Sequence, residues 1–170
     1  MNYLEEYNHD KGPILDCNFK SFSNAEEYIN LAESNILTSR SYYIVKDFSD
    51  SPWQLAYDFV NSIKNRLKKS SKLYRESLNE TILGNISNPS IAFVDFDSIS
   101  SDMLKILFSK VTFGGVIVVT SSRANTDCIN TLSSIFPRSI LVNNENYILI
   151  RKTNLYNSGV KPSRSKSNLT

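Results

Sequence analysis

The sequence predicts an α/β fold, a three-layer sandwich in which helices cover both faces of a mostly parallel, seven-stranded sheet that ends in an antiparallel hairpin. Two observations predict it. From residue 14 to residue 135, apolar segments of strand length alternate with segments of helical periodicity, which is typical of a parallel sheet covered on both faces. The last two apolar segments, 140–142 and 147–150, follow one another across Asn143-Asn144-Glu145-Asn146, and this predicts the hairpin.

The first half of the chain supplies three of the strands and two helices. Residues 14–17 follow Gly12-Pro13 and predict a first strand, and Ser23 with Glu26 fits the capping box of a helix. Aromatic and β-branched residues at 42–45 predict the second strand, which ends at Asp47, and Lys72 to Arg75 predict an edge strand. Between them a helix is expected from Pro52, with these residues on its apolar face: Leu55, Phe59, Val60, Ile63 and Leu67.

The second half continues the alternation. A helical turn is expected at 78–83, and the run 91–96, which is apolar except for Asp95, predicts a strand buried on both faces. Ser100 or Ser101 is expected to cap the next helix, and Gly114-Gly115 turns the chain into a central strand at 116–119. A last helix from Asn125 to Ile135 is ended by Pro137.

Length and composition indicate one domain. The chain has 170 residues, 41% of them hydrophobic and 21% charged, and we expect one domain over residues 1–153. Residues 154–170 are rich in Asn, Ser, Lys and Pro, so we expect a disordered basic tail. The chain shows neither a long apolar run nor a signal-peptide pattern, which favours a cytoplasmic protein without a membrane partner. The two cysteines, Cys17 and Cys128, are expected to be buried free thiols.

The net charge of +2 is unevenly distributed, because six basic residues crowd the stretch from Lys64 to Arg75. Such a stretch binds phosphate, RNA or an acidic partner in some proteins, but a solvated helix face is the commoner explanation. The stretch shows no aromatic interleaving that suggests stacked bases. Nucleic acid therefore ranks behind a small-molecule substrate or a protein partner, and the sequence leaves a homo-oligomer open.

Two segments carry a family resemblance. Phe93-Val94-Asp95-Phe96-Asp97, followed after a helix by Gly114-Gly115-Val116-Ile117-Val118-Val119, resembles class I S-adenosylmethionine-dependent methyltransferases, and among them the macrocin-type and catechol-type O-methyltransferases. The resemblance covers roughly residues 12–152. It implies a Rossmann-like fold, S-adenosylmethionine as cofactor, and transfer of a methyl group to the hydroxyl of a sugar or small molecule.

The resemblance also assigns site residues. It implies that Asp95 or Asp97 takes the acceptor's proton. It implies a cofactor-binding set at the strand ends, comprising Asp16, Asn18, Asp47 and Glu76. The bottom-up alternative for each acid is a structural one: a strand-end carboxylate that caps a neighbouring helix or turn, with Asp97 capping the helix near Ser100.

The chain departs from the family pattern at two places. The turn after the first strand contains no glycine, and Phe19, Lys20 and Phe22 are expected to place bulk where a cofactor needs space. The metal-binding pair after the Gly-Gly strand is Thr120-Ser121, and neutral hydroxyls are poor ligands for Mg²⁺, so we expect no metal. Two hypotheses follow: an active methyltransferase, or an inactive methyltransferase-like scaffold that binds a protein partner through its basic helix and tail.

Overall fold

The structure is a computed structural model, and it describes residues 12–19, 40–49, 52–137, 140–143 and 147–152. The predicted capping box at Ser23 and Glu26, the bulk expected from Lys20 and Phe22, and the predicted tail at 154–170 lie outside the described residues. No helix among the described ranges is both long and apolar enough to cross a membrane.

Seven strands form one sheet in the order β3-β2-β1-β4-β5-β7-β6. The five parallel strands are β1 (Ile14–Asp16), β2 (Tyr42–Val45), β3 (Ser71–Tyr74), β4 (Ile91–Asp95) and β5 (Gly115–Thr120). The closing hairpin consists of β6 (Ile140–Asn143) and β7 (Ile148–Lys152), and β7 pairs antiparallel with both β5 and β6. The predicted fold class is thereby confirmed.

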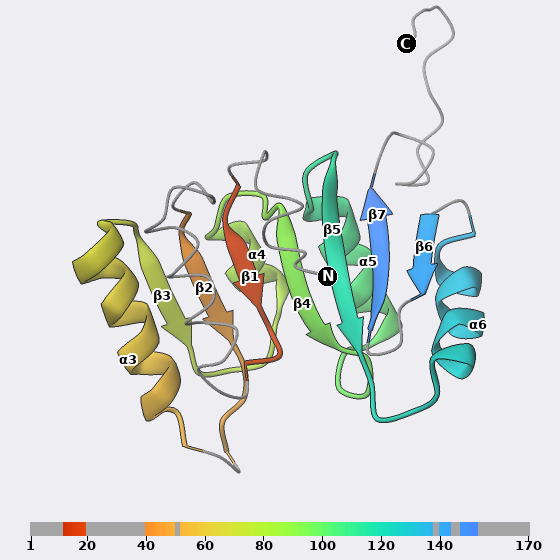
Figure 1. The fold of residues 1–170 in the computed structure, drawn as a ribbon, viewed down its shortest axis with the longest axis horizontal. Coiled ribbons are helices and arrows are strands. Elements are labelled where there is room, and N and C mark those ends of the chain that lie inside the picture. Colours follow the sequence, from red (N-terminus) through yellow and green to blue (C-terminus); the bar gives the residue numbers. More distant parts are fainter. Residues whose placement is uncertain (1–11, 20–39, 50–51, 138–139, 144–146, 153–170) are drawn as a thin grey trace, which may run out of the picture.

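Helices cover both faces of this sheet (Figure 1). The described helices are α3 (Gln54–Ser62), the π-helix η1 (Ile63–Leu67), α4 (Glu80–Gly84), α5 (Ser101–Lys110) and α6 (Asn125–Ile135). Ser100 caps α5, because its hydroxyl accepts a hydrogen bond from the backbone N–H of Met103. Asn79 caps α4 in the same way through Ile82.

The core consists of one apolar cluster on each face. Alternate residues of a strand point to opposite faces, so Ile14 joins the cluster beneath α3 while Leu15 joins the cluster beneath α4, α5 and α6. β4 and β5 are buried on both faces over almost their whole length, as their apolar runs predict. The carboxyl ends of these two central strands are therefore anchored in the core.

At the amino ends of the parallel strands, β7 is bonded to the end of α5, and β5 lies close against the residue before β4. The Lys152 ammonium is buried and donates hydrogen bonds to the carbonyl oxygens of Phe108, Ser109 and Val111, at 2.8, 3.1 and 2.7 Å. These carbonyls lie at the end of α5, where intrahelical partners run out. Gly115 has no room for a side chain, because a Cβ there would lie 2.6 Å from the carbonyl oxygen of Ser90.

The α3 region differs from the prediction in two respects. The helix begins at Gln54 rather than Pro52 and passes into a π-helical turn at Ile63. Leu55, which was expected on the apolar face, is 43% exposed, whereas Ala56 is buried in its place. The inward positions are Ala56, Phe59, Val60 and Ile63, which is helical spacing shifted by one residue at the start.

Candidate functional site

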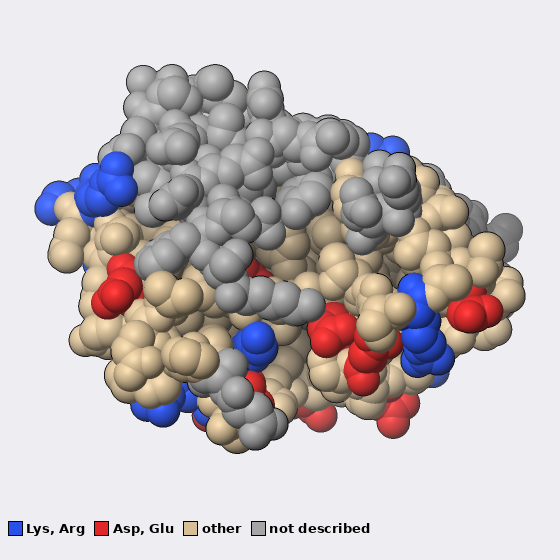
Figure 2. Space-filling model, turned by 60° about the horizontal axis from the view of Figure 1, so that its bottom comes forward, with Lys and Arg blue, Asp and Glu red and all other residues tan. Residues whose placement is uncertain are grey.

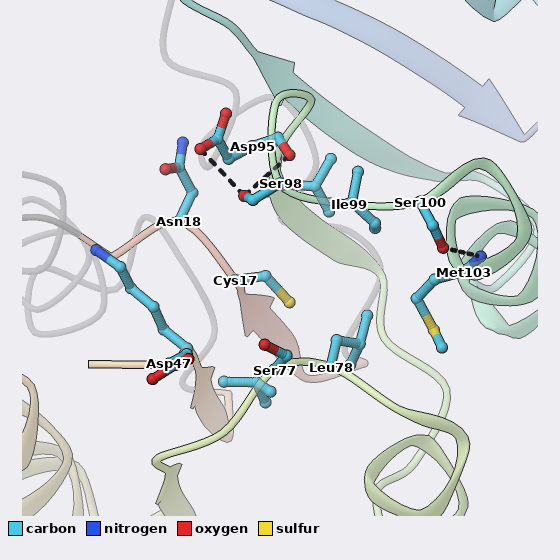
Figure 3. Close-up of a pocket in the computed structure, with 13 residues that line it drawn as sticks. Cys17, Asn18, Asp47, Ser77, Leu78, Asp95, Ser98, Ile99, Ser100 and Met103 are labelled. Atoms are coloured by element: carbon cyan, nitrogen blue, oxygen red, sulfur yellow. Dashed lines mark hydrogen bonds between the residues drawn. The ribbon is translucent and has the colours of Figure 1, made fainter. Parts of the chain in front are cut away.

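A cleft of about 400 Å³ opens at the carboxyl ends of β1, β2 and β4 (Figure 3). This is where the strand order reverses around β1, and open α/β sheets bind ligands at such a point. The volume is in the range of small-molecule sites. The lining residues are Cys17, Asn18, Val45, Lys46, Asp47, Ser77, Leu78, Val94, Asp95, Ser98, Ile99, Ser100 and Met103.

Asp95 and Asn18 line one end of the cleft (Figure 3). The Asp95 carboxylate accepts hydrogen bonds from the backbone N–H of Asp97 and from the Ser98 hydroxyl, both at 3.1 Å. The Asn18 amide donates across the sheet to the hydroxyl of Thr120, at the end of β5. The Asp95 carboxylate and the Asn18 side chain therefore lie together at this end of the cleft, where both can contact a ligand.

The other end of the cleft is formed after β2 and β3, by Lys46, Asp47, Ser77 and Leu78. One Asp47 oxygen accepts a hydrogen bond from the backbone N–H of Ser49 at 2.9 Å, which orients the carboxylate. The Lys46 ammonium donates to the carbonyl oxygen of Phe19 at 2.9 Å and so joins the β1 turn to the end of β2. Leu78, Ile99 and Met103 add an apolar wall.

Figure 2 brings this carboxyl edge forward and shows acidic side chains gathered on it, with basic side chains among them. The described lining contains two carboxylates, Asp47 and Asp95, and one ammonium, Lys46. The cleft is therefore mixed in charge, with an acid at each end.

Asp16 lies beneath the cleft rather than in it. Its carboxylate is 5% exposed and accepts hydrogen bonds from the Tyr42 hydroxyl at 2.8 Å and from the backbone N–H of Asn18 at 2.9 Å. Burial raises the pKa of Asp16 to about 6, although both hydrogen bonds and the nearby Lys46 oppose that rise. Asp16 thus shapes the turn that follows β1.

Asp97 turns away from the cleft toward the loop after β5. Its carboxylate accepts hydrogen bonds from the hydroxyls of Ser121 and Ser122 and from the backbone N–H of Ser122, each at 2.8 Å. The Arg123 guanidinium lies 3.4 Å away. These donors, the Ser122 backbone N–H first, hold the pKa of Asp97 well below its usual range. Asp97 therefore joins two loops and does not cap α5, which Ser100 does.

Phe19, in the described part of the glycine-free turn, does not line the cleft. Phe19 is only 4% exposed and lies in the cluster between the sheet and α3, where its ring stacks on Phe59 of α3 with centroids 5.9 Å apart. The expectation that Phe19 fills the cofactor space is therefore wrong. Among the described residues, positive φ occurs only at Lys68 and Gly114, so residues 17–19 adopt a backbone that does not need glycine.

The structure brings some of the predicted site residues together and leaves others apart. Asn18, Asp47 and Asp95 line one cleft, whereas Asp16 is buried below it and Asp97 faces the 121–123 loop. Glu76 lies outside the lining and accepts a hydrogen bond from the Asn79 amide at 2.9 Å. The sequence analysis missed the cleft residues Lys46, Ser98 and Met103, although each lies within four residues of a predicted strand end or helix cap.

Both cysteines are free thiols, as expected. Cys128 is buried in the core, but Cys17 is half-buried and lines the cleft. Burial, with the neighbouring Asp16 second, raises the pKa of Cys17, so this thiol stays protonated and is a poor nucleophile.

No group of three or more His, Cys, Asp or Glu side chains suited to a metal ion occurs within the described ranges. Thr120 and Ser121, at the position where the metal-dependent enzymes have ligands, bond to Asn18 and Asp97 instead.

The fold is that of class I S-adenosylmethionine-dependent methyltransferases. An rRNA methylase from Streptococcus thermophilus superposes with a TM-score of 0.56 at 13% identity, covering 90% of this chain and 93% of that one. A precorrin-6y C5,15-methyltransferase from Geobacter metallireducens gives 0.52 at 14% identity, over 87% and 83% of the two chains.

The methyltransferase MycE of the mycinamycin biosynthetic pathway, in complex with Mg and S-adenosylhomocysteine, gives a TM-score of 0.57 at 12% identity. The match covers 98% of this chain and 48% of that one. No family model matches the sequence, and no curated protein matches it either. At these identities the likeness establishes the fold.

Proposed function

We propose that this protein is an S-adenosylmethionine-dependent methyltransferase that acts on the hydroxyl of a sugar or small molecule. The observation that carries the proposal is the cleft itself. It lies at the reversal point of a methyltransferase-type sheet and presents a carboxylate at each end, Asp47 and Asp95.

The residues present fit the cofactor. Asp47 keeps one carboxylate oxygen for ribose hydroxyls beyond the oxygen that Ser49 engages. Leu78, Ile99 and Met103 offer an apolar wall to a flat ring, and the cleft volume suits a ligand of this size. Phe19 does not enter the cleft, because its ring packs against Phe59 between the sheet and α3. Asp16 would hold this turn in shape without touching the ligand.

When bound, the cofactor supplies an electrophilic methyl group on a sulfonium centre. The acceptor hydroxyl must lose its proton as its oxygen gains the methyl group. We assign this proton to Asp95, because its carboxylate lines the cleft. Ser98 and the backbone N–H of Asp97 hold Asp95 in one orientation, so much of the catalysis rests on positioning. Asp97 is less suited, because its donors disfavour protonation of its carboxylate.

One argument for the inactive-scaffold hypothesis is weaker for Phe19, because this side chain is buried against Phe59 and does not line the cleft. No observation among the described residues favours it over the methyltransferase.

Labelled methyl transfer to a panel of sugars and small hydroxyl compounds tests the proposal. Asp95→Asn should lower kcat about 10²- to 10⁴-fold and leave S-adenosylhomocysteine binding intact. Asp127→Ala, an exposed change on α6, is the matched control and should alter neither. Equal turnover by wild type and Asp95→Asn would remove Asp95 from the reaction.

A further inference from the structure

The end of the sheet formed by β3 and α3 carries a concentration of positive charge. Residues 52–76 contain six basic and two acidic side chains, whereas the whole chain has a net charge of +2. All six basic residues are exposed. We name this end, which Figure 1 shows beyond β2, the β3 edge surface; its residues are Trp53, Tyr57, Lys64, Arg66, Lys68, Lys69, Lys72, Tyr74 and Arg75.

Aromatic rings lie among these charges. The Arg75 guanidinium lies 4.1 Å from the ring centroid of Trp53, and Trp53 meets Tyr57 edge to face at 5.6 Å. Tyr57 is 48% exposed. The Lys72 ammonium lies 4.8 Å from the Tyr74 ring. Trp53 is the N-cap residue of α3 and Tyr57 lies on α3, so only the fold brings these two rings to the end of β3.

The backbone keeps the basic side chains on the outside. The π-helical turn η1 leaves Lys64, Asn65 and Arg66 exposed in succession, and Lys68 then adopts a left-handed conformation that leads into β3. Within the described sheet β3 is an edge strand that pairs only with β2, and Lys72 is exposed on it. Basic side chains therefore follow the edge from the end of η1 to Arg75.

We propose that the β3 edge surface binds single-stranded nucleic acid. Lysine and arginine side chains along an edge suit a phosphate backbone. The exposed ring of Tyr57, beside the partly buried rings of Trp53 and Tyr74, suits an unpaired base, because bases stack on aromatic faces irrespective of sequence. An acidic protein segment would pair with the basic side chains but would not stack on the aromatic rings. The inference does not rest on the proposed methyl transfer, because none of these residues lines the cleft.

The test is fluorescence anisotropy of the full chain with labelled 20-nucleotide single-stranded RNA and DNA at several salt concentrations. Wild type should bind with an affinity that falls steeply with salt. Lys68→Ala combined with Lys72→Ala should weaken binding about tenfold and flatten the logarithmic salt slope by about 1.4. Tyr57→Ala should weaken binding about 5- to 150-fold, the loss expected for one stacked base.

Lys105→Ala combined with Lys110→Ala removes two charges from α5 and is the matched control, which should bind like wild type. An equal loss in both double variants would reduce the effect to overall charge and overturn the proposal. The proposal would also be overturned if wild type did not bind the RNA or DNA at 50 mM salt. It would be overturned as well if polyglutamate bound as tightly as the nucleic acid and Tyr57→Ala did not change the polyglutamate affinity. S-adenosylhomocysteine titrations of the same variants report on the cleft separately and should be unaffected.

Discussion

Replacing Asp16 with asparagine tests how the turn beneath the cleft is built. Because burial raises the pKa of Asp16 to about 6 from an ordinary 3.8, the folded protein holds a proton on Asp16 between about pH 4 and pH 6 that the unfolded chain has released. Stability from this group is therefore present below pH 4 and is lost as the pH rises through 6. About two pK units correspond to about 3 kcal/mol.

Asp16→Asn is nearly isosteric and cannot titrate. Its amide oxygen can accept from the N–H of Asn18, and its NH₂ can donate to the Tyr42 oxygen. We expect the free energy of unfolding of Asp16→Asn, minus that of wild type, to rise by about 2.4 kcal/mol between pH 4 and pH 7, most of the full difference. Urea denaturation at half-unit pH steps measures the free energy of unfolding of both proteins. The contributions of the other titrating groups cancel in the difference, because both proteins share them.

Tyr42→Phe is the companion variant. It removes a donor that lowers the pKa of Asp16, so the same pH-dependent loss of stability should move to higher pH. A difference between Asp16→Asn and wild type that stays constant from pH 4 to pH 7 would refute the assignment of a raised pKa to a buried carboxyl.

Three further substitutions probe the packing, each read by urea denaturation. Lys152→Met should cost about 2–4 kcal/mol, since three carbonyl oxygens lose a charged donor, while Lys105→Met on the exposed side of α5 should change stability by under about 0.5 kcal/mol. Phe19→Ala should cost about 3–5 kcal/mol and leave S-adenosylhomocysteine affinity unchanged; tighter binding would place the ring in the cleft after all. Gly115→Ala should cost about 2 kcal/mol or more, whereas Gly84→Ala, which meets nothing within 4 Å, should be neutral or stabilising.

The sheet could be predicted because its signals are local. The runs at 91–94 and 116–119 are apolar without interruption, and the hairpin follows from two apolar segments separated by polar residues. Strand ends also located the cleft, since Asn18, Asp47 and Asp95 each follow or close a predicted strand. These features need no knowledge of how distant segments meet.

The features that the sequence missed depend on contacts between distant segments. Phe19 reads as bulk in a turn, and only the position of Phe59 on α3 shows that the ring packs beneath the sheet. Asp97 reads as a helix cap until the loop at 121–123 is seen to supply its donors. Leu55 fits an apolar helix face four residues before Phe59, but Ala56 stands three and four residues before Phe59 and Val60 and is the residue that is buried.

Calorimetric titration with S-adenosylhomocysteine tests the central claim, that the cleft at the end of β1, β2 and β4 holds the methyltransferase cofactor. We predict saturable one-to-one binding, with a matching rise in melting temperature. Asp47→Ala should weaken this binding by about 1–3 kcal/mol, and Asp127→Ala should bind like wild type. Added Mg²⁺ should not change the affinity. No heat and no melting shift at millimolar ligand, or equal affinity in Asp47→Ala and wild type, would contradict the account.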